Sequence, residues 1–164
     1  MSCRKITLLL TGLYLCGLIT FPLIVYAESA PGFTLPADSG QVTLADLHGK
    51  VVYLDFWATW CVPCRKSFPW FNDVLARYKD KGFVIVAVNL DKDKSDVRKF
   101  LEKYPADFSV AYDPDGEVAV KYQVKVMPSS YLIDRNGEIQ LSHGGFREKD
   151  KPKLESAIKS LLEQ

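Results

Sequence analysis

The sequence has no excess of charge of either sign. Its 21 lysines and arginines are matched by 20 acidic residues, which gives a formal net charge of +1 at pH 7. Without residues 1–27, which carry Arg4 and Lys5 and no acid, 19 basic residues remain against 20 acidic ones. A nucleic-acid partner or an anionic-membrane patch is therefore not expected. Internal repeats and low-complexity tracts are also lacking, and 48% hydrophobic residues predict one globular domain of ordinary size.

Cysteine and histidine are scarce. Four cysteines and two histidines occur in 164 residues, and Cys3 and Cys16 fall within the first 27. Only Cys61 and Cys64 remain for the rest of the chain. A small exported domain held together by disulfides would contain more cysteines, and a structural zinc ion usually takes four ligands. The sequence therefore predicts no metal, no cofactor and no disulfide framework.

One long uncharged run lies at the start of the chain. Arg4 and Lys5 precede 22 uncharged residues, 6–27. A positive start, an apolar stretch and a small residue at Ala27 predict a secretory signal peptide, and Pro22 breaks the run shortly before that site. The alternative is an uncleaved membrane anchor, because about 20 apolar residues can span a bilayer.

A lipid attached to Cys16 is a third interpretation of the leader. It fits less well, because Leu15 is not the small residue that precedes such cysteines. All three interpretations place residues 28–164 outside the cytoplasm, since positive residues ahead of an apolar segment stay inside. The predicted organisation is thus a leader at 1–27 and one domain at 28–164.

The chain is organised around Cys61 and Cys64, which follow an apolar run, Val51–Trp57. That run is rich in β-branched and aromatic residues and too short for a helix, so it predicts a buried strand. An amphipathic helical pattern begins after it. Cys61 is then expected at a helix amino end, where free N–H groups and the helix dipole favour a thiolate. Pro63 is tolerated in a first helical turn, and Cys64 can close a small disulfide ring.

This spacing and context predict a redox dithiol, with a structural disulfide or half a zinc site as the alternatives. The segment Asp55–Cys64, DFWATWCVPC, resembles the active-site segment of the thioredoxin superfamily. It resembles more closely the TlpA/ResA-like thiol-disulfide oxidoreductases, a membrane-associated or secreted bacterial branch. The resemblance covers roughly residues 31–162 and implies a location in the periplasm or on the outer face of the inner membrane.

The resemblance implies an α/β, thioredoxin-like fold: a central mixed β-sheet flanked by helices on both faces, with an N-terminal β-hairpin extension. The sequence pattern predicts a linker at 28–32, with Asp91–Lys99 as a solvated loop and helix start rather than a docking patch. His48 is expected in a surface turn and His143 at a strand end facing solvent. The expected strands are 33–36, 41–44, 51–57, 83–90, 108–111, 130–133 and 138–143, and the expected helices follow Cys61 and span about 95–104, 117–122 and 148–162.

Met127 and Pro128 form a second motif before a predicted strand. They resemble the cis-proline loop of the superfamily, and only before proline does a cis peptide bond cost little. In the family this loop packs against the dithiol and offers backbone groups to an extended substrate. An ordinary trans proline at a strand edge is the alternative.

The resemblance also implies the mechanism. Cys61 would attack a substrate disulfide, and Cys64 would then resolve the mixed disulfide. Asp55 would be the base for Cys64, because a lone carboxyl in an apolar strand has a pKa raised toward neutrality. An edge aspartate with an ordinary pKa is the alternative, and the next strand, 84–90, lacks the lysine that thioredoxins place near this acid. Trp60, Val62, Pro63, Met127 and Pro128 would bind the substrate.

The expected function is reduction of disulfides in exported proteins, of the cytochrome c maturation type, with a membrane electron donor as partner. Two other classes remain open. A thiol peroxidase shares the fold, although the Pro-x-x-x-Thr/Ser-x-x-Cys pattern is absent around Cys61. A Cu(I) carrier could use the two thiolates, because soft sulfur ligands suit that ion.

Overall fold

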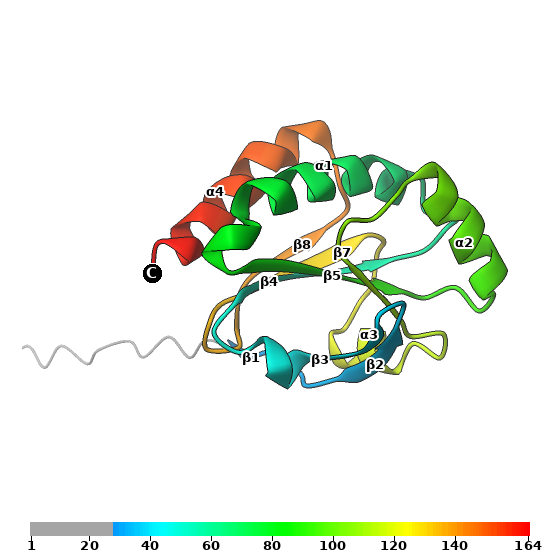
Figure 1. Ribbon diagram of the computed structural model, residues 1–164, viewed down its shortest axis with the longest axis horizontal. Helices are drawn as coiled ribbons and strands as arrows, with labels where there is room; N and C mark the ends of the chain where they lie inside the picture. Colours follow the sequence, from blue (N-terminus) through cyan, green and yellow to red (C-terminus); the bar gives the residue numbers. More distant parts are fainter. Residues whose placement is uncertain (1–27) are drawn as a thin grey trace, which may run out of the picture.

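The centre of the fold is β4, Val51–Trp57, whose seven residues are all buried. The structure is a computed structural model that describes residues 28–164. It pairs β4 in parallel with β5, Phe83–Asn89, and antiparallel with β7, Ser129–Ile133. Eight strands form one mixed sheet in the order β1-β8-β7-β4-β5-β6-β2-β3 (Figure 1). The remaining strands are β1, Glu28–Ser29; β2, Thr34–Ala37; β3, Gly40–Thr43; β6, Ser109–Tyr112; and β8, Glu138–Gly144.

Helices lie on both faces of this sheet, as predicted (Figure 1). One face carries the three longer helices: α1, Val62–Tyr78; α2, Lys94–Lys103; and α4, Lys151–Leu162. The other face carries the short helix α3, Glu117–Lys121, and the β2–β3 hairpin. The thioredoxin-like architecture expected from the sequence is therefore confirmed.

Side chains of β4 alternate between two apolar cores. Tyr53 and Trp57 point to the face covered by α1, α2 and α4, and join a largely aromatic cluster. Leu54 and Phe56 point to the opposite face and pack with the hairpin and α3. This alternation with a period of two is what a strand buried on both faces produces, and it decides that Asp55 lies on the α1 face.

One local prediction is corrected, and the start of α2 is defined by a side-chain cap. The linker predicted at 28–32 is wrong at its first two residues, because Glu28 and Ser29 pair antiparallel with Ile139 and Glu138. Two residues carry no periodicity, so a strand made by long-range pairing leaves no local signal. Asp93 caps α2, since its Oδ1 accepts a 2.7 Å hydrogen bond from the backbone N–H of Ser95.

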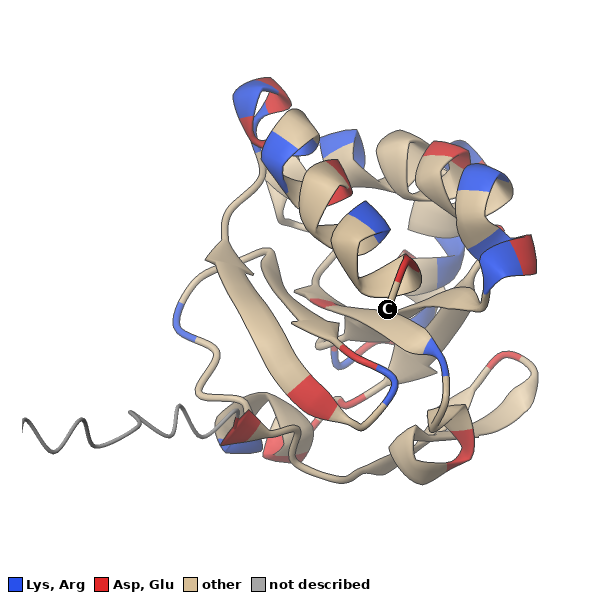
Figure 2. Ribbon diagram, turned by 90° about the vertical axis from the view of Figure 1, so that its left-hand side faces the viewer, with Lys and Arg blue, Asp and Glu red and all other residues tan. Residues whose placement is uncertain are grey.

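Charged residues of both signs are interspersed along the outer faces of the helices, as Figure 2 shows. One group links α1 to α4: Glu155 accepts hydrogen bonds from Arg77 and from the Tyr78 hydroxyl, the latter at 2.7 Å. These contacts, first that of Arg77, lower the pKa of Glu155 to about 2.

The predicted signal peptide or anchor, residues 1–27, lies outside the described residues. Within residues 28–164, no helix is long and apolar enough to cross a membrane.

Candidate active site

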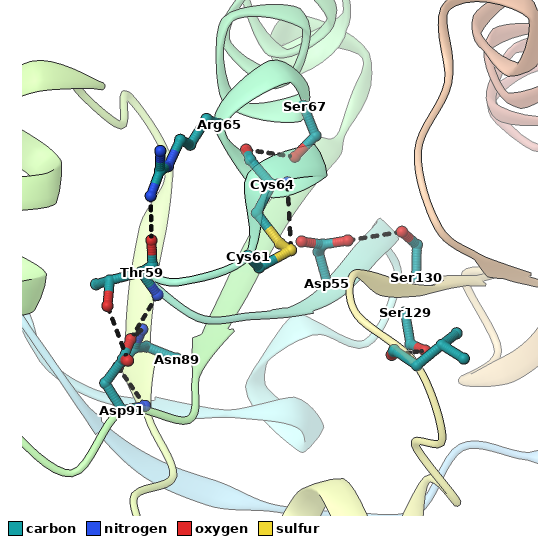
Figure 3. The surroundings of a disulfide bond; sticks show 11 residues. Asp55, Thr59, Cys61, Cys64, Arg65, Ser67, Asn89, Asp91, Ser129 and Ser130 are labelled. Carbon is teal, nitrogen blue, oxygen red and sulfur yellow. Dashed lines mark hydrogen bonds between the residues drawn. A yellow bond between two sulfur atoms is a disulfide. The ribbon is translucent and has the colours of Figure 1, made fainter.

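The two cysteines of the motif form a disulfide at the start of α1 (Figure 3). Cys61 is the N-cap residue, with extended backbone angles of φ −78° and ψ 105°, and its Sγ accepts the backbone N–H of Cys64 at 3.3 Å. Pro63 occupies the first helical turn, where its missing N–H removes no helical bond. Cys61 is 4% exposed and Cys64 is 0% exposed. Cys61 is thus the sulfur nearer to solvent.

The carboxyl group of Asp55 points toward the disulfide in Figure 3. The residue is 0% exposed, and Ser130 Oγ donates a 2.6 Å hydrogen bond to its Oδ1. Burial raises the pKa of Asp55 to about 8, and the Ser130 hydrogen bond only partly offsets this effect. The alternative of an edge aspartate is wrong, because β4 is a central strand.

The neighbours of Asp55 in the sheet are not cationic. On β5 its register partner is Ala87, and on β7 it is Ser130. Within residues 28–164, no cationic group lies within 4.0 Å of the Asp55 carboxylate. The lysine that thioredoxins use is therefore not replaced by a direct ion pair.

The carboxylate of Asp91 holds the loop between β4 and Cys61 in place. From the sequence, Asp91 was expected in a solvated loop without a role in the site. Asp91 accepts the backbone N–H of Thr59 at 2.8 Å and its hydroxyl at 2.9 Å. The buried amide of Asn89 donates to the same carboxylate at 2.7 Å, and Arg65 donates to the Thr59 carbonyl at 3.3 Å. Asp91 follows the end of β5, and parallel strands bring the residues at their carboxyl ends to one edge of the sheet. This placement is the sequence feature that could have indicated a role for Asp91 near the dithiol.

The second motif forms the other wall of the site. The Met127–Pro128 peptide bond is cis, as the resemblance implied. Met127 shares a groove of about 510 Å³ with the dithiol segment. The groove is lined by Trp60, Cys61, Val62, Pro63, Leu90, Ala119, Val124, Lys125, Val126 and Met127. Cys61 lines it and Cys64 does not, so a substrate in the groove meets the first sulfur only.

Several large apolar side chains of the groove are exposed to solvent. Trp60 is 66% exposed and Val62 is 59% exposed, and they flank Cys61 in sequence. Val126 on the facing loop is also more than half exposed. Exposed apolar side chains gathered around a reactive group indicate a contact surface for another molecule. The structure thus brings together four predicted substrate-binding residues, with Pro128 next to Met127.

His143 is not where the sequence predicted it. It was expected to face solvent, but its side chain is 17% exposed. It pairs in register with Ser130, the donor to Asp55, and lies on the α1 face of the sheet. Strand alternation could have indicated this position, because Leu141, two residues earlier, packs against the same core.

Comparisons with known proteins agree with this geometry. Residues 26–142 match the AhpC/TSA family. The chain is 44% identical over 118 residues to the thiol-disulfide oxidoreductase ResA of Oceanobacillus iheyensis, covering 69% of this chain and 62% of that protein. It is 35% identical over 160 residues to the ResA protein of Bacillus thuringiensis, covering 91% of each.

Solved structures give the same assignment. A protein assigned as the thiol:disulfide interchange protein DsbE of Chlorobium tepidum superposes with a TM-score of 0.81 at 55% identity, covering 83% of this chain and 96% of that one. A protein assigned as a disulfide isomerase of Bacteroides thetaiotaomicron follows with a TM-score of 0.77 at 30% identity, covering 87% and 92%. The chain therefore belongs to the AhpC/TSA family, and within it to the thiol-disulfide oxidoreductases of the ResA and DsbE type, with Cys61 and Cys64 as its Cys-x-x-Cys pair.

Proposed function

We propose that this protein reduces disulfides in exported proteins outside the cytoplasm, as the oxidoreductases of cytochrome c maturation do. The observation that carries the proposal is the unequal placement of the two sulfurs. Cys61 lines the exposed groove, whereas Cys64 is fully buried and outside the groove lining. The Asp55 carboxyl group points toward the disulfide (Figure 3). The leader pattern at 1–27 supports the location.

The reaction transfers two electrons in two steps. The Cys61 thiolate attacks one sulfur of the substrate disulfide, forms a mixed disulfide and releases the other sulfur as a thiolate. Cys64 then gives its proton to the Asp55 carboxylate and attacks Cys61 Sγ. The mixed disulfide breaks, the substrate leaves with both sulfurs reduced, and the protein is left oxidised. A membrane electron donor would reduce it again.

Asp55 suits the second step because its pKa of about 8 is matched to a thiol proton near neutral pH. A carboxyl with an ordinary pKa would be a much weaker base for this proton. The charged form of Asp55 is costly in its buried position, so accepting the Cys64 proton also relieves an unfavourable charge.

The groove is suited to an extended, unfolded segment of substrate. Its lining is apolar apart from Lys125 and the backbone, and an extended chain could bond to backbone groups at Met127. Trp60 and Val62 would cover apolar residues next to the substrate cysteine. A protein with exposed, unpaired cysteine segments is the substrate class that this surface favours.

Trp60→Ala is expected to raise the KM for a protein disulfide about tenfold, because truncating an exposed aromatic contact residue costs about 1–2 kcal/mol of binding. The rate with a small disulfide, such as oxidised glutathione, should not change. Val120→Ala is the matched control, since Val120 is an exposed apolar residue outside the groove lining. Equal losses with both substrates would argue against a contact role for Trp60.

The direction of electron flow is tested by the reduction potential of the Cys61–Cys64 pair in residues 28–164. Equilibration against glutathione and dithiothreitol should give a value at or below about −230 mV, as a reductant requires. A value above about −180 mV would assign an oxidant or isomerase and contradict the proposed role in cytochrome maturation.

One other function has a specific observation in its favour. Met127 lines the same groove as Cys61, so its thioether and the two thiolates could bind Cu(I). Tight stoichiometric Cu(I) binding without disulfide reductase activity would favour that alternative. Peroxide consumption without a protein disulfide substrate would instead favour a thiol peroxidase.

A further inference from the structure

A row of three polar side chains crosses the α1 face of the sheet. Asp55 on β4 pairs in register with Ser130 on β7, and Ser130 pairs with His143 on β8. Residues directly opposite on antiparallel strands point to the same face, with Cβ atoms about 4.5–5.5 Å apart. The neighbouring row is Tyr53, Leu132 and Leu141, in which the Tyr53 hydroxyl is the only polar side-chain group. The row of three polar side chains therefore crosses a layer that is mostly apolar.

The row leads from the buried dithiol to the protein surface. Its inner end is Asp55. At the outer end, His143 Nε2 lies 3.4 Å from Asp150 Oδ2, and the Asp150 side chain is 11% exposed. Arg147 holds Asp150 with bonds of 2.9 and 3.2 Å, and its own side chain is 64% exposed. The row therefore begins at a fully buried carboxyl group, Asp55, and ends at two partly buried side chains, His143 and Asp150, beside the exposed Arg147.

Two residues of this row have buried polar atoms without a hydrogen-bond partner in the described part of the chain. Among residues 28–164, four buried side-chain N and O atoms have no hydrogen-bond partner, and two of them are Asp55 Oδ2 and His143 Nε2. A third is the Tyr53 hydroxyl, whose pKa is raised first by burial and then by the Asp55 charge, and is partly lowered by the nearby Ser130 hydroxyl. Buried polar groups nearly always have partners, so the unpartnered Asp55 Oδ2 and Tyr53 hydroxyl point to a place for water beside Asp55. His143 Nε2 is the atom that faces Asp150, at the outer end of the row.

We propose that Ser130 and His143 carry the proton that Asp55 takes from Cys64 out to solvent, with water between Ser130 and His143. The proposal rests on the proposed role of Asp55 as base. The other groups facing Asp55 are Tyr53, the dithiol and, from β5, Ala87. Tyr53 and Ala87 do not exchange protons near neutral pH, and the dithiol is the source of the proton. An imidazole can accept and release a proton in this range.

The proton balance involves no electrons. Protonated Asp55 gives its proton to Ser130 Oγ while the hydroxyl proton of Ser130 moves to the water, and the water gives a proton to His143. His143 releases a proton to solvent beside Asp150, and Asp55 returns to its carboxylate form. A substrate seated in the groove covers the Cys61 side, so this route keeps proton release open during the resolving step. His143 is then a positioning residue that acts through Asp55.

The test follows the resolving step in single turnovers. The fully reduced protein reacts with an aromatic disulfide that releases one coloured thiolate when Cys61 attacks and a second when Cys64 resolves. We expect His143→Gln to slow the second release about tenfold, below the usual range of 10²- to 10⁴-fold for a positioned base, since His143 acts indirectly. The first release should not change. His48→Gln is the matched control, because His48 is the other histidine and is exposed.

Two readouts separate proton transfer from a structural effect. Added imidazole should restore the second release in His143→Ala, and the slowed step should show a larger solvent deuterium effect than in wild type. Ser130→Ala should slow the same step and provides a second variant should the His143 variants fold poorly. The proposal would be overturned if His143→Gln and Ser130→Ala both released the second thiolate at the wild-type rate. It would also be overturned if imidazole did not restore the slowed release.

Asp55→Asn distinguishes this proposal from the one on which it rests. Slow second release in Asp55→Asn together with wild-type release in the His143 and Ser130 variants would leave Asp55 as base and remove the route. Wild-type release in Asp55→Asn would remove both proposals.

Discussion

Cys64→Ala is expected to stop turnover after a single event and to leave the substrate covalently joined to Cys61. Cys61 lines the groove and can still attack, but the sulfur that resolves the mixed disulfide is gone. Multiple-turnover activity should fall by about 10³-fold or more, as when one member of a reacting unit is removed. Mass spectrometry under non-reducing conditions should show a one-to-one adduct that dithiothreitol releases.

The matched control is Cys61→Ala, which keeps the buried sulfur of Cys64 and loses the accessible one. It should give neither turnover nor adduct, because Cys64 is 0% exposed and lies outside the groove lining. An equal yield of adduct from Cys61→Ala would show that the two cysteines are interchangeable and would contradict the assigned order of attack.

Asp55→Asn is expected to stabilise the oxidised protein by about 2 to 4 kcal/mol at pH 7. The pKa of Asp55 is about 8 in the folded protein and about 3.9 in an unfolded chain. The folded state therefore holds this proton more tightly, and its contribution to stability is complete below about pH 4 and lost as the pH rises toward 8. Asparagine is neutral throughout and can still accept the Ser130 hydrogen bond.

Urea denaturation of wild type and Asp55→Asn at several pH values checks this prediction. The two free energies of unfolding should converge near pH 4 and separate steadily as the pH approaches 8. Asp107→Asn changes an exposed aspartate with no side-chain hydrogen bond and should follow the wild-type curve at every pH. A difference between Asp55→Asn and wild type that stays constant with pH would rule out a raised pKa as its cause.

Asp55 is thus predicted to lower the stability of the protein at the pH where it works. A more stable asparagine variant that resolves the mixed disulfide slowly would show both effects of the same buried charge. The two properties are measured independently, so each can fail without the other.

Local sequence patterns were sufficient for the elements that carry the dithiol. The seven buried residues of β4 and the helix after Cys61 follow from composition and periodicity, because both are determined by neighbours in sequence. The apolar strand also favoured a buried Asp55 but left an edge aspartate as the alternative, and the central position of β4 decides for burial. The cis bond before Pro128 came from resemblance and is confirmed.

Contacts made between distant strands could not be predicted in the same way. Asp91 was assigned to a charged, solvated segment, and only the pairing of β4 with β5 brings it against Thr59. Ser130 and His143 lie in one row with Asp55 because of the register of three strands, which a one-residue shift would have changed completely. The two reacting cysteines can thus be recognised from neighbouring residues in the sequence. The contacts that support them depend on the pairing of strands that are distant in the sequence.

The short strand β1 determines where the chain enters the domain relative to the dithiol. Glu28 and Ser29 pair with the beginning of β8, whereas the end of β8 pairs with Ser129 beside the active-site end of β4. A seven-residue strand is about 20 Å long, so the entry point and the dithiol lie at opposite ends of the sheet. Whatever is joined to the chain ahead of Glu28 is therefore attached to the domain about one strand length away from the dithiol, and leaves the groove beside Cys61 open to a substrate.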